Sequence, residues 1–385
     1  MIAYTNYRSD GRVIREAEAA VGAGLDVDFI ALRRKGDPKV EVIKGVRVIH
    51  LNQSRYRGGA LFAYMVSYLQ FFIRCLCKVT FLFLSRRYGV IHVNNMPDFF
   101  VFCALLPKLM GAKVMLDIHD PMAETFASKF KNGEQSLAFK MLLWQELLSA
   151  RFADRILTVS EPLKRHILMG HGVPEESIDV IANFADDQLF RVREGYTING
   201  KLRLVFHGTI LERYGLGDLL TALSKVRNRD KLAVRFIGEG DFAPQLKAMI
   251  RSLGIDDFVE FDNQVYPLQE IPRLIADCNL GLVPLETSSI INYALPVKML
   301  EYISMGMPVV TVRTVAVGYY FSENDCLFYV PDDPESLPKL LDRLAENPNL
   351  VMQYRKTARA IREHFLWSNE KRKYVTVLQK LAKHH

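Results

Sequence analysis

The sequence predicts an α/β fold built from two Rossmann-like domains that face each other across a cleft. A chain of 385 residues exceeds what one hydrophobic core usually supports. Short apolar strands alternate with helical stretches twice along the chain, which is typical of parallel sheets covered by helices. Between the two alternations lies Asp186–Gly200, a polar stretch without clear periodicity. We expect domains at 1–187 and 188–365, followed by a helix at 366–385 that crosses back to the first domain.

The composition indicates an ordinary globular protein whose charge is unevenly distributed. Hydrophobic residues make up 49% of the chain, charged residues make up 24%, and the net charge is +7. Between Val42 and Pro97 there are eight Lys and Arg residues and no acidic residue. The five cysteines show neither disulfide-framework nor metal-ligand spacing, and Met1–Tyr7 lacks the layout of a signal peptide. We therefore expect a cytoplasmic protein.

The first domain is expected to alternate strands and helices. Asp10 suits a helix N-cap, Lys44-Gly45 indicates a hairpin turn, and Gly111 ends a helix. Strands are expected at Met1–Asn6, Val27–Leu32, Val40–Ile43, Val46–Leu51, Val90–Val93, Val114–Ile118, Ile156–Val159 and Val180–Ala182. Helices are expected at 10–23, Phe99–Met110, Glu134–Arg151 and Glu161–Met169.

The most hydrophobic segment, Leu61–Ser85, predicts a helix that lies in an anionic membrane interface. Gln70, Arg74 and Lys78 interrupt it before about 20 uninterrupted apolar residues accumulate, so we do not expect it to span a membrane. Each cation near an anionic membrane contributes ~1 kcal/mol to binding. The membrane-facing cations are expected to be Arg55, Arg57, Arg74, Lys78, Arg86 and Arg87. The alternative is a buried helix whose basic residues reach the surface. Nucleic-acid binding is disfavoured because the aromatic residues lie inside the apolar run.

The second domain repeats the alternation. Its strands are expected at Leu202–His207, Ala233–Ile237, Val259–Phe261, Leu280–Val283, Pro308–Thr311 and Leu327–Val330. Helices are expected from about Leu216 and at Pro296–Met305, Pro334–Glu346, Leu350–Phe365 and Asn369–Lys383, with Glu286–Asn292 as a loop.

The helix at Pro296–Met305 carries the main indication of a ligand. Lys298 lies in its first turn, where the helix macrodipole is already positive and a cation costs ~0.3–1 kcal/mol. A bound anion reverses that sign, and Glu301 lies three residues later on the same helical face. A phosphate next to a polyol such as ribose would satisfy both side chains. The alternative is a surface Lys–Glu pair, worth ~0.2–0.5 kcal/mol.

Two glycine-containing loops follow neighbouring strands of the same domain. The first, Gly208–Gly215, includes Arg213, and the second is Gly238-Glu239-Gly240. Backbone N–H groups in such loops can approach an anion closely. Each loop is a weak signal alone, because glycine often follows a strand for steric reasons. Together with the helix at Pro296–Met305, they favour a nucleotide site.

One histidine of the first domain is a second candidate. His119 follows a predicted strand and either contacts a ligand in the cleft or caps the chain by bonding Asp120 or backbone. Asp26-Val27-Asp28 lies at the start of a strand, so we expect no metal site there. The sequence contains no Walker A loop, GxGxxG fingerprint or HExxH motif.

These segments resemble the retaining GT-B glycosyltransferases of the large family-four group. Residues 296–310, PVKMLEYISMGMPVV, resemble that family's P-x-K-x-x-E-Y motif and the G-x-P-V strand after it. HGTILERYG, FIGEGDFAPQL and VEFDNQVYPLQEIPRLIADCNLGLVPL resemble its preceding segments in the same order. NNMPDFFVFCALLPKLMGAKVMLDIHD resembles members that build exopolysaccharide and lipid-linked glycans.

The resemblance implies roles for individual residues. Glu301 would bind the nucleotide ribose, with Lys298 and Arg213 near the diphosphate, and His119 would touch the transferred sugar. We group His119, Arg213 and Lys298 as catalytic. The implied donor-binding residues are Gly208, Thr209, Gly238, Val265, Asn292, Tyr293, Leu295 and Glu301.

The chain departs from the family pattern at three places. Tyr293 stands where the family often has a glutamate that contacts the donor sugar. Thr209 and Tyr214 stand where the phosphate loop often has Arg and Lys. Asp10-Gly11-Arg12 replaces the usual glycine-rich first loop, which leaves the acceptor contacts there open.

The implied function is transfer of a sugar, with retention and without a metal or other cofactor, from a nucleotide-sugar to a hydroxyl group. UDP is favoured over GDP, and the expected acceptor is a polyprenyl-diphosphate-linked saccharide at the inner face of the membrane, to which the protein attaches peripherally. One alternative is a sugar-nucleotide epimerase of the same fold, which needs paired carboxylates. Another is a non-catalytic binding or membrane-docking subunit, suggested by Tyr293.

Overall fold

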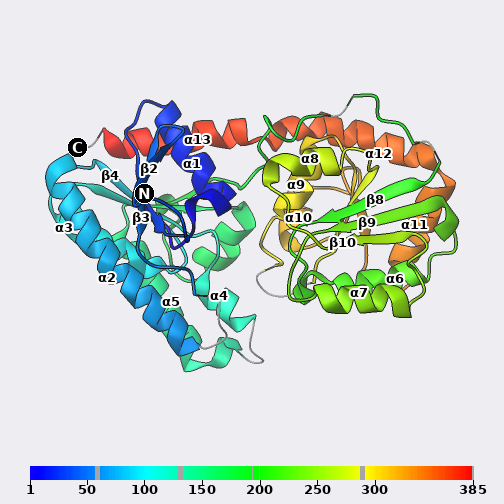
Figure 1. The fold of residues 1–385 in the computed structure, drawn as a ribbon, viewed down its shortest axis with the longest axis horizontal. Coiled ribbons are helices and arrows are strands. Elements are labelled where there is room, and N and C mark those ends of the chain that lie inside the picture. Colours follow the sequence, from blue (N-terminus) through cyan, green and yellow to red (C-terminus); the bar gives the residue numbers. More distant parts are fainter. Residues whose placement is uncertain (57–60, 129–132, 193, 199, 287–290, 384–385) are drawn as a thin grey trace. The chain divides into compact units, whose positions relative to one another are not determined.

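The chain folds into two units, each an α/β layered structure. The computed structural model describes residues 1–56, 61–128, 133–192, 194–198, 200–286 and 291–383. The first unit comprises Met1–Ala182 together with Glu370–His385, and the second comprises Asn183–Asn369. Figure 1 shows the sheets and the helices around them.

The first unit contains one sheet in two parts that are joined by a single residue. Its strands are β1 (Asp28–Leu32), β2 (Val40–Ile43), β3 (Val46–Leu51), β4 (Val90–Asn94), β5 (Lys113–Asp117), β6 (Arg155–Thr158) and β7 (Ile178–Val180). The order is β1-β3-β2 in one part and β4-β5-β6-β7 in the other, and only β2 runs antiparallel. Ile2 forms bridges to both Ile30 and Val93 and so links the two parts. The predicted strand at Met1–Asn6 is therefore wrong in extent, because the bridges form at Ile2 and the chain already bends at Tyr4 and Thr5.

Ahead of its carboxyl-terminal helix, the first unit has the α-helices α1 (Gly11–Gly22), α2 (Leu61–Arg86), α3 (Leu105–Leu109), α4 (Met122–Ala127) and α5 (Leu137–Phe152). The helix predicted at Glu161–Met169 is a π-helix over Leu163–Leu168. Asp10 caps α1 as predicted, since its side chain accepts a hydrogen bond from the Val13 N–H. The helix predicted from Phe99 begins instead as a 3-10 helix at Asp98–Ala104. The helix predicted from Glu134 begins at Leu137, because the Ser136 hydroxyl caps it by accepting from the Phe139 N–H.

The second unit contains a parallel sheet in the order β10-β9-β8-β11-β12-β13. Its strands are β8 (Leu202–His207), β9 (Leu232–Ile237), β10 (Val259–Asp262), β11 (Leu280–Val283), β12 (Val309–Val312) and β13 (Leu327–Tyr329). Its helices are α6 (Leu216–Ser224), α7 (Ala243–Ser252), α8 (Ile271–Leu274), α9 (Val297–Ser304), α10 (Val315–Tyr320), α11 (Ser336–Glu346) and α12 (Pro348–Ile361). This alternation agrees with the predicted strands and with the helical stretches expected between them, although no bounds were predicted for α10.

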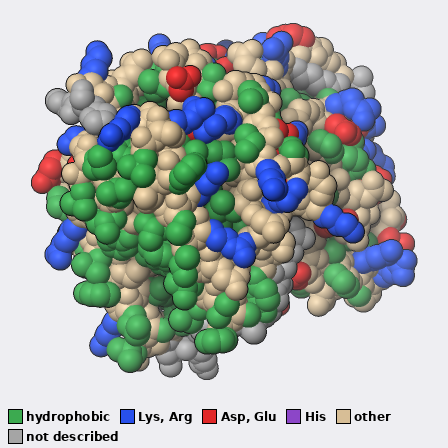
Figure 2. All heavy atoms as spheres, turned by 60° about the vertical axis from the view of Figure 1, so that its left-hand side comes forward, with side chains coloured by type: hydrophobic (Ala, Val, Ile, Leu, Met, Phe, Trp, Pro, Cys, Tyr) green, Lys and Arg blue, Asp and Glu red, His purple; other side chains and the backbone are tan. Residues whose placement is uncertain are grey.

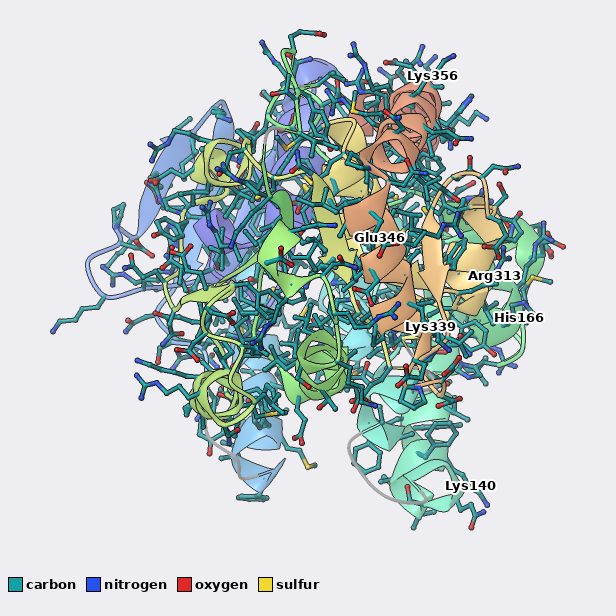
Figure 3. All side chains as sticks on the ribbon, turned by 90° about the vertical axis from the view of Figure 1, so that its right-hand side faces the viewer. Lys140, His166, Arg313, Lys339, Glu346 and Lys356 are labelled. Carbon is teal, nitrogen blue, oxygen red and sulfur yellow. The ribbon has the colours of Figure 1, made fainter. Side chains whose placement is uncertain are left out.

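The core of the second unit lies between the sheet and helices from both halves of its sequence. Leu204 and Phe206 of β8 pack with Leu220 of α6 and Leu341 of α11, and all four are fully buried. The other end of α11 is fixed by polar contacts, because Glu346 accepts a hydrogen bond from Asn228 at 2.9 Å. Figure 3 shows Lys339 and Glu346 on α11 and Lys356 on α12.

The last helix, α13 (Trp367–Ala382), completes the first unit from Glu370 onwards. Tyr374 is fully buried, and its hydroxyl lies 3.0 Å from Nδ1 of His92 on β4. Glu370 is also buried and accepts a hydrogen bond of 2.8 Å from the Ala182 N–H. The end of the chain is therefore part of the core of the first unit.

Candidate functional site

Tyr302 fixes helix α9 against the carboxyl end of β8. Its hydroxyl donates to the Val205 carbonyl and accepts from the His207 N–H, both at 3.1 Å. Its ring lies against Gly281 of β11, so closely that a Cβ at Gly281 would come within 2.1 Å of the ring. Because the strand and the helix are held together in this way, the first turn of α9 lies beside the end of β8. The sequence predicted α9 within one residue at each end, with Pro296 preceding its first residue.

Lys298 lies in a partly buried aromatic environment at the start of α9. Its Nζ is 3.7 Å from the ring centroid of Phe206 and 4.8 Å from that of Tyr214. Among the described residues, no carboxylate lies within ion-pairing distance, 4.0 Å, of this ammonium. Burial lowers the pKa of Lys298 to about 7, although the nearby Glu301 acts in the opposite direction. The site therefore holds a cation that an incoming anion would stabilise.

Glu301 lies one helical turn after Lys298 and contacts a histidine at the end of β8. Oε2 of Glu301 is 3.2 Å from Nε2 of His207, and both residues are buried. Burial, together with the charge of Lys298, lowers the pKa of His207 to about 3, so its imidazole is neutral at physiological pH. His207 was not among the predicted site residues, although its place as the last strand residue before Gly208 was a usable signal.

The two glycine loops of the second unit lie in contact with each other. The Ile210 N–H donates to the Glu239 carbonyl at 2.9 Å, and the Gly208 N–H donates to the Ile237 carbonyl at 2.9 Å. Gly238 has φ of +142°, and a Cβ there would lie 1.9 Å from the Gly208 carbonyl oxygen. Only glycine permits this approach. Gly208 in turn lies against Lys298, whose Nζ would be 3.6 Å from a Cβ at that position.

Other predicted donor-site residues lie at the surface of the same unit. Thr209 and Arg213 are exposed, and the Arg213 guanidinium lies 5.7 Å from the ring centroid of Tyr214. Val265 has 73% of its surface exposed. These residues are accessible to a ligand, whereas the tightly fixed part of the site consists of Gly208, Gly238 and the first turns of α9.

The predicted loop before α9 is partly described. Residues 287–290 lie outside the described part of the chain, and Asn292, Tyr293 and Leu295 are half-buried. Asn292 binds the first turn of α10, because its Oδ1 accepts from the Val315 N–H at 3.0 Å and its carbonyl accepts from the Ala316 N–H at 2.9 Å. Its side-chain oxygen therefore helps to hold this loop against the start of α10.

His119 belongs to a buried ionic network in the first unit. Its Nδ1 lies 3.4 Å from Oδ2 of Asp117, so its nearest carboxylate is Asp117 and not Asp120 as the capping alternative supposed. Burial disfavours the charged imidazole, but the Asp117 carboxylate outweighs this and raises the pKa of His119 to about 9. His119 is therefore cationic at neutral pH.

Arg12 is a second member of this network that the sequence did not reveal. It is buried, and its Nε and Nη2 donate to the two Asp117 oxygens at 2.6 and 2.9 Å. Nη1 donates to the Ile181 carbonyl at 2.9 Å. The bidentate pair fixes Asp117, which in turn orients His119. In place of a glycine-rich loop, the chain here uses Asp10-Gly11-Arg12 to tie α1 to the end of β5.

The structure describes all the predicted membrane-facing cations except Arg57, which lies outside the described residues. Arg55, Arg74 and Arg87 are exposed, and Lys78 is half-buried. Arg86 differs from expectation, because its Nε lies 3.5 Å from Asp28 and the ion pair offsets part of its charge.

Helix α2 exposes a large apolar face. By length and composition, Phe62–Arg86 is long and apolar enough to cross a membrane, with 28% of the most apolar window buried, so the three polar residues do not exclude a span on those grounds. Its other face packs into the first unit through Phe71, Cys75 and Val79, all buried. Hydrophobic side chains gather on the exposed side of this unit, as Figure 2 shows. They include Phe62, Met65, Leu69, Ile73, Phe81 and Leu84 of α2, Leu105 and Leu109 of α3, and Leu137, Met141 and Trp144 of α5.

Among the described residues, two groups of side chains have ligand atoms close enough for a metal ion, and all of these residues are buried except the half-buried His171. They are Glu16, His92 and Asp117, and Glu124, Glu146 and His171. In the second group both nitrogens of His171 are engaged, by Glu124 at 2.8 Å and by Glu146 at 2.7 Å. These carboxylates raise the pKa of His171 to about 10 against the effect of burial, which indicates an imidazolium held by two acids.

Comparison with known proteins covers most of the chain. Residues 12–189 match the family described as Glycosyltransferase Family 4, and residues 201–347 match Glycosyl transferases group 1. A chitobiosyldiphosphodolichol beta-mannosyltransferase of Debaryomyces hansenii is 21% identical over 54% of this chain, which spans 48% of that relative. Sucrose-phosphate synthase from Thermosynechococcus elongatus superposes with a TM-score of 0.80 at 15% identity, covering 99% of this chain and 98% of the other. Anabaena HepE in complex with UDP gives 0.73 at 14% identity, covering 98% and 99%. These likenesses confirm the predicted fold class.

Proposed function

Because the chain belongs to the family-four glycosyltransferases of the GT-B fold, we propose that it moves a sugar, with retention, from a UDP-sugar to a membrane-presented saccharide. Glycosyltransferase activity follows from the family. The further proposal is that the acceptor hydroxyl belongs to a polyprenyl-diphosphate-linked saccharide in surface polysaccharide or glycan assembly.

The observation that carries the proposal is the pair of side chains on the first turns of α9. A diphosphate at the helix start would meet Lys298 and the N–H groups of the first turn. The ribose hydroxyls would donate to Glu301, whose Oε2 lies 3.2 Å from Nε2 of His207. One ligand would therefore stabilise both a partly buried ammonium and a buried carboxylate.

The choice of UDP rests on a likeness and on an opening in the structure. HepE, which has this fold, was solved with UDP. In this chain the backbone around the exposed Val265 is open to a base. We therefore test UDP first. GDP, whose guanine is larger than a pyrimidine, is the second nucleotide to test.

The reaction separates charge, and two cations would lie near the diphosphate, on which the negative charge develops. As the bond to the sugar breaks, the diphosphate gains negative charge, which Lys298 and Arg213 would stabilise without a metal. In a retaining reaction the departing phosphate can take the proton of the acceptor hydroxyl, so we assign no side-chain base. His119, a cation oriented by Asp117, would contact the transferred sugar.

We also propose that the first unit binds peripherally to the cytoplasmic face of a membrane. The sequence suggested α2 alone, whereas the exposed apolar residues of α3 and α5 enlarge this surface. Apolar side chains bordered by cations are typical of interfacial binding. Replacing Arg55, Arg57, Arg86 and Arg87 by uncharged residues should reduce sedimentation with anionic vesicles. Unchanged sedimentation would count against this surface.

Incubation of the purified protein with UDP- and GDP-sugars tests the reaction and its alternatives. We expect slow hydrolysis of one UDP-sugar that releases the sugar with its anomeric configuration retained, as read by proton NMR. An inverted product would refute retention, and an epimerised nucleotide-sugar would point to an epimerase. Binding without turnover, even with a lipid-linked acceptor, would indicate the non-catalytic subunit that Tyr293 suggests.

A further inference from the structure

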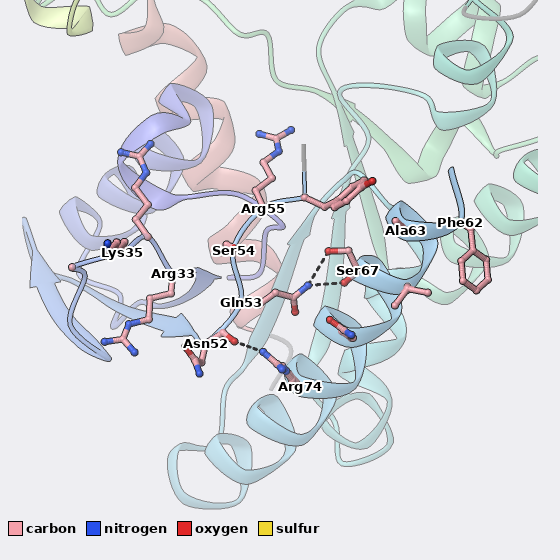
Figure 4. A pocket seen from close by; sticks show the side chains of 15 residues that line it. Arg33, Lys35, Asn52, Gln53, Ser54, Arg55, Phe62, Ala63, Ser67 and Arg74 are labelled. Atoms are coloured by element: carbon pink, nitrogen blue, oxygen red, sulfur yellow. Dashed lines mark hydrogen bonds between the residues drawn. The ribbon is translucent and has the colours of Figure 1, made fainter. Parts of the chain in front are cut away.

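An open pocket of about 1060 Å³ lies within the first unit, at the edge where β1 and β3 end. These strands are parallel neighbours, so the residues that follow them reach the same edge of the sheet. Arg33, Arg34 and Lys35 follow β1, and Asn52–Arg55 follow β3. The amino-terminal half of α2 forms the remaining wall, as Figure 4 shows.

The pocket is strongly basic. Its lining includes five cations and no carboxylate, and none of the five forms an ion pair within the described part of the chain. The cations are Arg33, Arg34, Lys35, Arg55 and Arg74. Like charges gathered in one concave surface repel one another, and an anion with more than one negative charge relieves that repulsion.

The walls of the pocket are fixed by hydrogen bonds. Gln53 donates to the Ser67 carbonyl at 2.7 Å and to its hydroxyl at 3.1 Å, which ties the loop after β3 to α2. Arg74 donates to the Asn52 carbonyl, and Arg33 donates to the Asp37 carbonyl at 2.9 Å. Figure 4 shows the bonds from Gln53 and Arg74 across the pocket. Two of the guanidinium groups are thus held in place while retaining N–H groups for a ligand.

The α2 wall changes from apolar to cationic along one helical stripe. Phe62, Val66, Gln70 and Arg74 are spaced four residues apart and all line the pocket. Phe62 has 77% and Val66 has 37% of its surface exposed, and both belong to the apolar face of α2. The pocket therefore combines a basic end with an apolar exit, which matches an amphiphile whose charged head carries phosphate.

We propose that this basic pocket binds the phosphate or diphosphate of the lipid-anchored acceptor, with the hydrocarbon chain leaving along Phe62 and Val66. The inference rests on the proposed function, since it places the anchor of that acceptor. Planar guanidinium groups bind phosphate oxygens in pairs, and the lysine adds a flexible charge. Binding the head group here would retain the acceptor while its saccharide extends from the pocket.

Farnesyl diphosphate, a short polyprenyl diphosphate, is a suitable probe of the full chain by isothermal titration calorimetry. We expect it to bind at least tenfold more tightly than inorganic pyrophosphate, which lacks the chain, and than farnesol, which lacks the charge. The double variant Arg34→Glu/Arg55→Glu should weaken this binding at least tenfold. The control Lys39→Glu/Arg151→Glu makes the same charge change at exposed residues outside the pocket and should leave it unaltered.

An equal loss of affinity for farnesyl diphosphate in the two double variants would overturn the assignment of the pocket, because it would show a general charge effect. Full affinity of Arg34→Glu/Arg55→Glu for farnesyl diphosphate would overturn it as well. Vesicles of phosphatidylglycerol distinguish the other source of phosphate. If binding to these vesicles requires Arg34 and Arg55 while farnesyl diphosphate does not bind, the pocket holds a membrane headgroup and the acceptor assignment is wrong.

The failure of this inference is separable from failure of the proposed function. If the wild-type protein hydrolyses a UDP-sugar but binds no farnesyl diphosphate, the pocket assignment falls and the enzyme remains. If it binds farnesyl diphosphate at these residues but neither binds nor cleaves any nucleotide-sugar, the proposed reaction falls and the anion site remains.

Discussion

Substituting Lys298 by methionine should weaken nucleotide binding and stabilise the free protein at the same time. Methionine keeps much of the length of the side chain and suits the neighbouring rings of Phe206 and Tyr214. A charge-assisted hydrogen bond contributes roughly 1.5–3 kcal/mol, so the affinity for UDP should fall roughly 10- to 150-fold. The variant also removes an ammonium group whose charged form burial disfavours in the free protein.

Lys298 should take up a proton when UDP binds, and it should make the stability of the free protein depend on pH. With a pKa of about 7, Lys298 is mostly neutral in the free protein at pH 8. A bound diphosphate would raise that pKa, so UDP should bind with uptake of roughly 0.8 proton, calculated for a rise of two units or more. The unfolded chain has the ordinary lysine pKa of 10.5 and binds more protons between about pH 7 and 10.5, so stability should rise with pH in that window.

Calorimetry in two buffers of different ionisation enthalpy measures the proton uptake, and thermal melting at several pH values measures the stability. Lys298→Met should abolish the uptake and flatten the pH slope. Lys247→Met, at an exposed position of α7, is the control and should alter neither. An unchanged UDP affinity, or uptake that persists in the variant, would refute the placement of the diphosphate beside Lys298.

The remaining predictions concern the same site and two structural groups. Glu301→Ala should weaken UDP binding about tenfold or more, because the ribose loses a charged acceptor, and unchanged affinity by calorimetry would contradict that role. Tyr302→Phe should lower stability by about 1–2 kcal/mol in denaturant unfolding, because the His207 N–H and Val205 carbonyl lose a buried partner. Gly238→Ala should destabilise far more than Gly254→Ala, since a Cβ at Gly238 meets the Gly208 carbonyl whereas Gly254 faces open space; similar melting temperatures would show that the loops can separate. His171 binds its proton more tightly when folded, so its contribution to stability should be complete below pH 6.5 and lost as the pH rises through about 10, and His171→Gln should remove that loss.

The sequence predicted the elements whose local signals agree with their environment. Helix α9 follows from Pro296 and its apolar periodicity, and β8 is a mostly apolar run that is buried in the sheet except at Arg203. The hairpin of β2 and β3 follows from Lys44-Gly45, both with positive φ. The short helix α4 was missed, and no bounds were predicted for α10, because each has too few residues to show a period.

Features set by distant contacts were harder to predict. The burial of Arg12 depends on Asp117, which is 105 residues away in the sequence. The pairing of His207 with Glu301 also joins distant segments. The exposure of the apolar residues of α3 and α5 was not predicted, because a hydropathy pattern does not distinguish apolar residues of the core from those that remain exposed. The roles of His119, Arg213 and the donor-loop residues stay predictions.

The place of α13 has a consequence for the order in which the protein can fold during synthesis. The second unit is contiguous, from Asn183 to Asn369, whereas the first needs Glu370 and Tyr374 from the end of the chain. A ribosome therefore releases all of the second unit before the first can be completed. Until α13 has been synthesised, His92 and the Ala182 N–H lack their native partners. Loss of the last 16 residues should consequently damage the half of the protein that is made first.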